Sequence, residues 1–221
     1  MTTEPIVTST IATGTHGRYL LRPCESALVL VGFHGYGENA EAQMARLEAI
    51  PGAERWLVVS IQGLHSFYER RTDRVVASWM TRQDRDTAIA DNLAYVARVI
   101  DAAIAGRTGP SVMVFAGFSQ GVAMAFRAAS LPGSSQRHVI AVGNDIPPEL
   151  TASDLARLDS VLVCRGADDP WYAAAAFERD CARLKDAGTV FQAVAVPGGH
   201  DWSQPVLDAT AGYLAGLAAG I

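Results

Sequence analysis

The sequence predicts an α/β fold with a mostly parallel, doubly wound β-sheet and helices on both of its faces. Two observations lead to this prediction. Short runs rich in Val, Leu and Ile recur along the chain without alternating with polar residues, which is typical of strands buried on both faces. Amphipathic helical stretches separate these runs. A chain of 221 residues has the usual length of one domain, so we expect a single domain over residues 1–221.

The strands fall into two groups. Residues 5–12 and 17–21 are short β-prone runs separated by Thr13, Gly14 and Thr15, which predicts an antiparallel hairpin at the N-terminus. The apolar runs that follow are too short for helices. They predict buried parallel strands at 27–33, 56–61, 111–116, 138–142, 160–164 and 190–196.

The clearest helix is predicted at 84–105, where apolar residues recur at steps of three and four on one face. Thr81 and Asp84 are placed to cap its start, and Gly106 follows its end. Further helices are predicted at 38–49, 120–131, 172–187 and 203–218. No stretch between strands is long enough for a large lid domain, so we expect an open site. In a doubly wound sheet that site lies at the carboxyl ends of the strands.

Composition argues against several classes of protein. The net charge of −5 comes from interspersed acidic and basic residues, without the basic stripe that binds nucleic acid. The three cysteines form no C-x-x-C pair and no regular framework, so we expect neither a disulfide scaffold nor a zinc site. No cluster of metal ligands appears, and we expect no metal and no cofactor. The chain has neither the start of a signal peptide nor the roughly 20 apolar residues that span a bilayer. We therefore expect a cytoplasmic protein without stable membrane insertion.

The strongest local motif is G-F-S-Q-G at 117–121, between an apolar run and a predicted helix. A sharp strand-to-helix turn needs small residues beside the nucleophile, and Gly117 and Gly121 meet that need. The turn would present the Ser119 hydroxyl at the tip of the sheet. The alternative is a chance match, because the bare pattern is common. The strand before it and the helix after it favour the functional interpretation.

A serine hydroxyl becomes a good nucleophile when an imidazole removes its proton and a carboxylate orients that imidazole. In this kind of site the acid and then the histidine follow the serine along the chain. His200 lies in P-G-G-H-D after a predicted strand, where Gly198 and Gly199 permit a sharp turn. His138 also follows Ser119, but it begins a predicted strand and so lies at the wrong edge of the sheet. His200 is therefore the candidate base.

The acid is expected in R-G-A-D-D-P-W, directly after the predicted strand at 160–164. Asp168 and Asp169 are adjacent there, and neighbouring side chains in an extended segment point to opposite sides. Pro170 favours an extended conformation at Asp169. Spacing alone gives Asp169 only a slight preference, and the other carboxylate would cap the next helix.

A candidate oxyanion hole is H-G-Y-G-E-N at 34–39, after the first buried strand. Its two glycines leave backbone amides open to a substrate oxygen. The amides of Tyr36 and Gln120 would then bind the negatively charged oxygen of a tetrahedral intermediate. The alternative is a plain strand-to-helix turn. The presence of G-F-S-Q-G in the same chain favours the oxyanion hole.

Together these segments resemble the phospholipase/carboxylesterase family of α/β-hydrolases, which includes acyl-protein thioesterases. The matching pieces are F-H-G-Y-G-E-N, G-F-S-Q-G, G-A-D-D-P and G-G-H, in family order across nearly the whole chain. The resemblance implies an α/β-hydrolase fold with Ser119, Asp169 and His200 as the catalytic residues. It also places the family's acid, the Asp directly before Pro, on Asp169, and the oxyanion amides on Tyr36 and Gln120.

The chain also departs from the family pattern. Arg165 stands where His is common before Gly, Val122 replaces a further Gly, and S-W-M-T-R-Q-D-R at 78–85 is unusually polar. The acyl-chain preference therefore cannot be carried over from the family. Aromatic and Met side chains in loops near the strand ends are candidates for an acyl pocket, although packing explains any single one as well. They are Tyr68, Trp79, Met80, Trp171, Tyr172 and Trp202.

The sequence predicts a serine hydrolase that cleaves an ester or thioester through a covalent acyl-serine intermediate. Its partner would be a small-molecule ester or an acylated substrate. The alternatives are a non-catalytic ligand-binding protein on the same fold and a hydrolase of a lactone or peptide. Gly212, Gly216 and Gly220 recur every four residues, which suits either helix packing on the sheet or a dimer face. We therefore expect a monomer or a homodimer.

Overall fold

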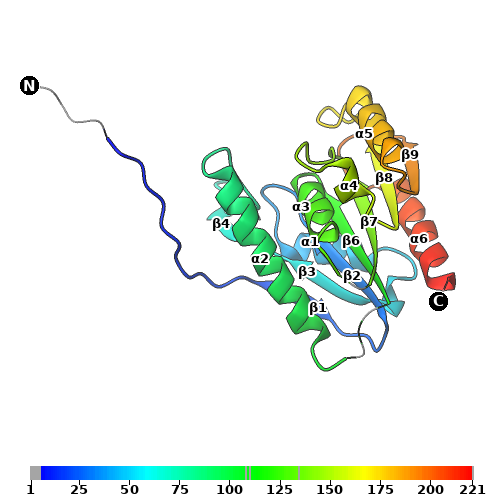
Figure 1. The fold of residues 1–221 in the computed structure, drawn as a ribbon, viewed down its shortest axis with the longest axis horizontal. Helices are drawn as coiled ribbons and strands as arrows, with labels where there is room; N and C mark the ends of the chain where they lie inside the picture. Colours follow the sequence, from blue (N-terminus) through cyan, green and yellow to red (C-terminus); the bar gives the residue numbers. More distant parts are fainter. Residues whose placement is uncertain (1–5, 108, 110, 134, 221) are drawn as a thin grey trace, which may run out of the picture.

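The computed structural model describes residues 6–107, 109, 111–133 and 135–220, and a seven-stranded sheet forms its centre (Figure 1). The strand order is β1-β3-β2-β6-β7-β8-β9, and every neighbouring pair is parallel except β1 with β3. The strands are β1 (Tyr19–Arg22), β2 (Leu28–Phe33), β3 (Leu57–Ile61), β6 (Val112–Phe118), β7 (Gln136–Val142), β8 (Ser160–Gly166) and β9 (Phe191–Val196). The predicted mostly parallel sheet is confirmed.

The antiparallel pair at the N-terminus is present, but its partner differs from the one expected. β1 pairs with β3, with Tyr19 opposite Ile61, rather than with the residues before it. Residues 6–12 form no strand, and residue 5 lies outside the described residues. Figure 1 shows this segment running away from the sheet. Residues 10–13 lie near His65 of the strand His65–Tyr68 without pairing with it, and an unpaired β-prone segment gains no ladder hydrogen bonds.

The helices lie on both faces of the sheet, as expected for a doubly wound fold. One apolar core packs α2, α3 and α5 on one face, and a second core packs α1 and α6 on the other. The helices are α1 (Ala40–Glu48), η1 (Ala53–Arg55), α2 (Arg85–Ile104), α3 (Gln120–Ala129), α4 (Ala152–Leu155), α5 (Ala174–Asp186) and α6 (Gln204–Ala219). Among the described residues, none of these helices combines the length and the apolar character that a membrane span requires.

The predicted cap of α2 is wrong. The Thr81 hydroxyl donates to the backbone oxygen of Gln83, and the Asp84 side chain makes no capping hydrogen bond to the helix. Asp84 instead takes a left-handed conformation with φ of 50°, which short polar residues tolerate better than most. Gly106, with φ of 74°, follows the end of the helix as expected.

A second, two-stranded sheet was not predicted from the sequence. β4 (His65–Tyr68) and β5 (Val75–Ser78) form an antiparallel hairpin between β3 and α2. The hairpin is bonded to the loop after β2, since the Gly37 amide donates to the Ala77 oxygen at 3.0 Å and the Ala77 amide donates to the Glu38 oxygen at 2.7 Å. The hairpin therefore supports the loop that contains Tyr36, one of the two candidate oxyanion donors.

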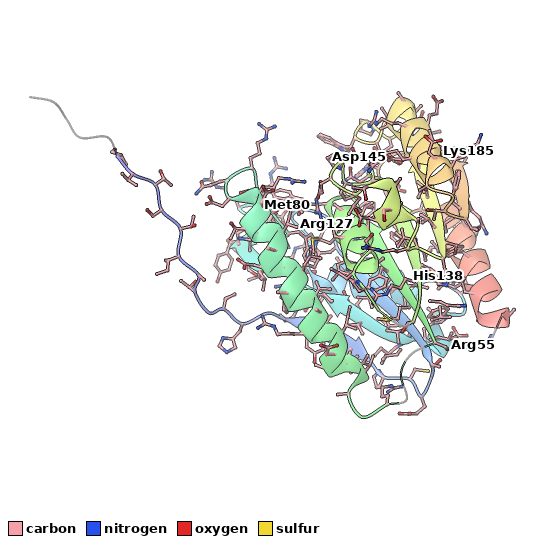
Figure 2. The ribbon with its side chains drawn as sticks, viewed as in Figure 1. Arg55, Met80, Arg127, His138, Asp145 and Lys185 are labelled. Atoms are coloured by element: carbon pink, nitrogen blue, oxygen red, sulfur yellow. The ribbon has the colours of Figure 1, made fainter. Side chains whose placement is uncertain are left out.

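His138 lies in β7 at the end of the sheet away from the candidate site, and Figure 2 shows it far from Asp145 at the opposite end. Its Nδ1 is 2.8 Å from the Ser160 hydroxyl, whose oxygen lies 2.6 Å from the Tyr213 hydroxyl. His138 Nε2 is buried and has no hydrogen-bond partner among the described residues. Burial lowers the pKa of His138, although the charge of Asp159 opposes that shift.

This buried imidazole predicts a loss of stability in acid. A pKa that is lower in the folded than in the unfolded chain means that the unfolded chain binds more protons below about pH 6.5. We expect the free energy of unfolding to decrease from pH 6.5 to pH 5, by up to about 1.4 kcal/mol per pH unit for one such group. Urea unfolding at several pH values measures this. His138→Gln should reduce the slope, whereas His65→Gln, at an exposed position, should not. Equal slopes in all three proteins would contradict the prediction.

Candidate active site

Ser119 lies at a sharp turn between β6 and α3. Its backbone has φ of 50° and ψ of −124°, a conformation that non-glycine residues rarely adopt and that costs about 1–3 kcal/mol. A Cβ placed on Gly117 would lie 2.5 Å from the Val122 Cα, and one on Gly121 would lie 2.1 Å from the Phe33 oxygen. Only glycine fits at these two positions, which is the role that the sequence motif predicts for them.

Asp169 and His200 are in contact at the carboxyl ends of β8 and β9. His200 Nδ1 lies 2.8 Å from Asp169 Oδ2, and the other carboxylate oxygen accepts the amides of Trp171 at 2.8 Å and Tyr172 at 3.0 Å. Burial alone would raise the pKa of Asp169. The hydrogen bonds from the Tyr172 amide, the His200 ring and the Trp171 amide outweigh burial and hold this pKa below its ordinary value. The carboxylate is therefore charged at neutral pH.

Asp168 has a different environment. Its side chain is exposed, and its amide donates to the Gly198 oxygen at 2.9 Å. It does not cap α5, because Ala173 is the residue before that helix and no side chain caps it. The structure thus pairs Asp169, and not Asp168, with the imidazole, and the expected capping role of Asp168 is wrong.

The loop after β7 brings Ser119 and His200 to the same place. The Ser119 amide donates to the Val142 oxygen at 2.9 Å, and the next residue, Gly143, faces the His200 ring. With φ of 76°, a Cβ on Gly143 would lie 3.1 Å from His200 Cε1. The ring also lies 5.1 Å from the ring of Phe118, the residue before Ser119. The Ser119 hydroxyl and the His200 imidazole are not hydrogen-bonded to each other in this structure. The distance between a nucleophile and its base is often long without substrate and shortens when substrate binds.

The loop after β2 lies against Ser119. A Cβ on Gly35 would be 3.3 Å from the Ser119 Cβ. Within the described residues the amide of Tyr36 donates to no acceptor, and the Gln120 amide is in the first turn of α3, where helical amides have no partner inside the helix. Two backbone donors are therefore available beside the hydroxyl, and the helix dipole of α3 favours negative charge there.

The side chain of Gln120 connects this site to the segment after β5. Its oxygen accepts the Trp79 amide at 3.0 Å, and its nitrogen donates to the Met80 oxygen at 3.0 Å. The sequence motif predicts a role only for the backbone amide of Gln120. The side-chain role depends on a segment about forty residues away, and a local motif cannot reveal it.

His34 supports the loop after β2 from below. Its Nε2 accepts the Gly63 amide at 3.0 Å, so the proton is on Nδ1, which donates to the Gly35 oxygen at 2.7 Å. Burial lowers the pKa of His34, although the hydrogen bond to Gly35 opposes that shift. The Trp79 indole donates to the His34 oxygen at 2.9 Å. A neutral imidazole with one fixed tautomer thus links the Gly35 carbonyl to the Gly63 backbone.

Two of the candidate pocket residues are not available to a substrate. Trp79 is 0% exposed and belongs to the apolar core, and Tyr172 is 1% exposed with its hydroxyl bonded to Asp180. Each polar group of these side chains has found a partner inside the protein, which stabilises the inward conformation. Their predicted place in an open acyl pocket is therefore corrected. Met80 is half-buried, with its sulfur 3.8 Å from Arg127. Trp171, at 79% exposed, is free at the surface.

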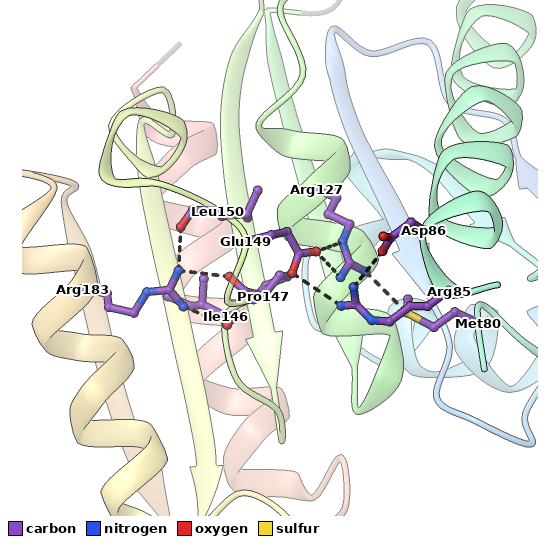
Figure 3. A network of polar contacts seen from close by, with 9 residues as sticks. All are labelled: Met80, Arg85, Asp86, Arg127, Ile146, Pro147, Glu149, Leu150 and Arg183. Carbon is purple, nitrogen blue, oxygen red and sulfur yellow. Dashed lines mark hydrogen bonds and ion pairs between the residues drawn. The ribbon is translucent and has the colours of Figure 1, made fainter. Parts of the chain in front are cut away.

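The loop of residues 143–150 also lies at the site and was not predicted from the sequence. The Asn144 side chain donates to the Ser119 oxygen at 3.1 Å, and Glu149 accepts from Arg127 at 2.8 Å. Figure 3 shows Glu149 between Arg127 and Arg85, with Arg183 on the other side of the loop. The Arg183 guanidinium donates to three loop carbonyls, those of Ile146, Pro147 and Leu150. Gly143 directly after a buried strand was the available signal for this loop, because functional loops leave the carboxyl ends of strands.

Arg165, which departs from the family pattern, stabilises the acid loop. Its Nε donates to the Tyr172 oxygen at 2.7 Å, and its Nη2 donates to the Ala167 oxygen at 2.9 Å. The arginine thus holds the backbone on both sides of Asp169. No group of three or more His, Cys, Asp or Glu side chains in the described part of the chain could hold a metal ion.

The chain is similar to a known protein family and to several solved structures. The family described as Phospholipase/Carboxylesterase matches residues 23–215. No curated protein matches the sequence. A carboxylesterase from Mesorhizobium loti is similar with a TM-score of 0.71 and 21% identity, over 90% of this chain and 95% of the other. The Bacillus cereus carboxylesterase is similar with a TM-score of 0.69 and 15% identity, over 89% and 92%.

Zea mays acyl-protein thioesterase 2 is a third similar structure, with a TM-score of 0.68 and 16% identity over 91% of this chain and 99% of the other. At these identities the likeness establishes the α/β-hydrolase fold. The family match covers most of the chain, including every segment of the candidate site. The chain belongs to the phospholipase/carboxylesterase family of hydrolases.

Proposed function

We propose that this protein is a serine hydrolase that cleaves a carboxylic ester or thioester through a covalent acyl-serine intermediate. The observation that carries the proposal is the Asp169–His200 contact of 2.8 Å beside the turn that contains Ser119. Because Nδ1 of His200 donates to the carboxylate, Nε2 is the nitrogen free to act as a base. An imidazole oriented in this way can activate the neighbouring hydroxyl.

In the first half of the reaction, Ser119 Oγ attacks the carbonyl carbon while His200 Nε2 takes the hydroxyl proton. The Tyr36 and Gln120 amides stabilise the negative charge on the carbonyl oxygen, a contribution of about 3 kcal/mol for each donor. The imidazolium then gives its proton to the departing alcohol or thiol. Asp169 keeps the ring oriented and stabilises its positive charge.

In the second half, water replaces the leaving group. His200 removes a proton from the water, the resulting oxygen nucleophile attacks the acyl carbon, and the tetrahedral intermediate forms again. It collapses to release the carboxylic acid, and His200 returns the proton to Ser119. Every proton is thus transferred by one imidazole, and no metal or cofactor enters the reaction.

Exposed aromatic residues at the site indicate that substrate reaches it directly from solvent. Tyr36 is 63% exposed and its ring lies 5.7 Å from that of Phe67 in the β4–β5 hairpin. Trp171 is exposed beside Asp169. These rings can contact the acyl or alcohol part of a substrate without enclosing it. Small esters, or an acyl chain presented on a larger molecule, are therefore the proposed substrate class.

Hydrolysis assays test this proposal. We expect turnover of p-nitrophenyl acetate, p-nitrophenyl octanoate or an acyl thioester, and the ranking of the three gives the preferred acyl length and leaving atom. We also expect a burst of p-nitrophenol equal to the protein concentration when deacylation is slow. A folded protein that turns over none of these acyl substrates would contradict the proposal. If the protein hydrolyses only a lactone or a peptide, the proposed ester or thioester substrate would be replaced by that acyl bond.

A further inference from the structure

A partly buried ion pair lies beside residues 34–39 after β2, which we call the oxyanion loop. Glu38 belongs to that loop and Arg46 to α1, and Arg46 Nη1 lies 2.7 Å from Glu38 Oε2 while Nη2 contacts Oε1. Their side chains are 24% and 20% exposed, compared with 52% and 49% for the Glu41–Arg18 pair. The Glu41–Arg18 pair also makes two contacts, so low exposure is what distinguishes the Glu38–Arg46 pair from ordinary surface ion pairs, which contribute little.

Glu38 also holds the backbone of the loop. Its Oε2 accepts the Gly35 amide at 2.8 Å, and its own amide donates to the Gly35 oxygen at 3.3 Å. Gly35 immediately precedes Tyr36 and lies against Ser119, because a Cβ placed on it would be 3.3 Å from the Ser119 Cβ. The carboxylate thus fixes the peptide next to the candidate oxyanion donor.

Arg46 contacts the other side of the site as well. Its guanidinium carbon lies 4.2 Å from the centre of the Phe118 ring, a cation–π distance. The same ring lies 5.1 Å from the His200 ring. One arginine therefore contacts both the residue that holds the oxyanion loop and the aromatic ring that packs on the candidate base.

The charges of the pair matter because of where they lie. An unpaired carboxylate beside the oxyanion amides would oppose the negative charge that develops on the substrate oxygen. Arg46 cancels that charge while leaving Glu38 able to hold the Gly35 amide. Burial would raise the pKa of Glu38, but the bond and charge of Arg46 and the Gly35 amide keep it below its ordinary value, so the carboxylate is ionised.

We propose that Glu38 and Arg46 are positioning residues of the acyl-transfer site: Glu38 orients the oxyanion loop through the Gly35 amide, and Arg46 neutralises Glu38 and supports Phe118. This proposal rests on the proposed function. It predicts an asymmetry between the two residues, because losing the arginine leaves an uncompensated negative charge beside the oxyanion hole. Losing the carboxylate charge only loosens the loop.

Steady-state kinetics of four proteins test the proposal: wild type, Glu38→Gln, Arg46→Met and the double variant. We expect kcat to fall about 5-fold in Glu38→Gln and about 50-fold in Arg46→Met, less than the 10²–10³-fold typical of a lost oxyanion donor, with KM changed by less than about 2-fold. The double variant should be more active than Arg46→Met alone, because the uncompensated charge is gone.

The exposed pair supplies the matched control. Arg18→Met and Glu41→Gln remove another arginine–carboxylate pair involving α1, and they should leave kcat unchanged. The free energy of unfolding of each variant, from urea titration, shows whether the protein is folded in the assay. A purely structural role would lower the concentration of active protein without lowering kcat per active site, which burst titration measures.

Two results would overturn the positioning role. One is a kcat for Arg46→Met equal to or higher than that of Glu38→Gln. The other is a double variant whose loss equals the product of the two single losses. If the wild-type protein turns over no acyl substrate, the proposed function fails and this proposal fails with it. If the wild type is active and the asymmetry is absent, only this proposal fails.

Discussion

Ser119→Ala should lower kcat by about a million-fold, the size of loss expected when the nucleophile of a cooperating triad is removed. The hydroxyl is the only group of this residue that takes part in the proposed chemistry, and no other described contact of the side chain depends on it. Alanine accepts the strained backbone conformation at this turn as well as serine does. We therefore expect the thermal midpoint to stay within a few degrees of wild type.

The measurement is the hydrolysis rate of a p-nitrophenyl ester at saturating substrate, with circular dichroism to show that the variant is folded. Ser130→Ala is the control, because Ser130 follows the same helix and, in the described part of the chain, its hydroxyl bonds the Phe126 oxygen alone. It should retain wild-type kcat. A loss below about 100-fold in Ser119→Ala would show that another group is the nucleophile.

Asp169→Asn should lower kcat by about 10,000-fold, because an amide in this place favours the wrong tautomer of the base. The His200 Nδ1 proton now has an acceptor 2.8 Å away, and an asparagine nitrogen there would force Nδ1 to accept instead. The proton would then be on Nε2, the nitrogen that has to receive the serine proton. The charge that stabilises the imidazolium would be lost as well.

Asp168→Asn is a closely matched control, since it makes the same change one residue earlier in an exposed side chain. It should leave kcat within about 2-fold of wild type. If Asp168→Asn caused the large loss and Asp169→Asn did not, the acid would have been assigned to the wrong carboxylate. Comparable losses in both variants would indicate damage to the loop rather than to the chemistry.

The depressed pKa of Asp169 has a consequence for stability. The folded carboxylate has a lower pKa than the unfolded one, so its stabilising contribution is present above the unfolded value of about 3.9. That contribution is lost as the pH falls through the lower, folded value. Asp169 therefore remains charged near neutral pH, and its protonation does not limit activity there.

The parts that the sequence predicts well are those with a local physical signature. Buried parallel strands appear as unbroken apolar runs, and the turn at Ser119 requires glycine at 117 and 121 because backbone atoms approach within van der Waals distance there. The order of serine, acid and histidine follows from the connections of the sheet. The choice between Asp168 and Asp169 needed the resemblance to the family, because adjacent residues have nearly the same spacing.

The parts that the sequence does not predict depend on partners far along the chain. Trp79 and Tyr172 follow strands and are aromatic, as expected for pocket residues. Both are nevertheless buried, because the Trp79 indole donates to the His34 oxygen and the Tyr172 hydroxyl donates to Asp180. Glu38 and Arg46 are in contact because α1 begins directly after the loop that contains Glu38, and the helix places Arg46, in its last turn, beside the Glu38 carboxylate. Whether a side chain in a loop points inward is set by such tertiary contacts, which leave no periodic pattern.

Covalent labelling with a fluorophosphonate, followed by peptide mass spectrometry, tests the central claim that an activated serine lies at the turn between β6 and α3. Only a serine that a base activates reacts rapidly with such a probe. We expect one label per chain, on Ser119, at a rate that falls sharply in a His200→Ala variant. A folded protein that stays unlabelled, or that carries the label on a different residue, would contradict it.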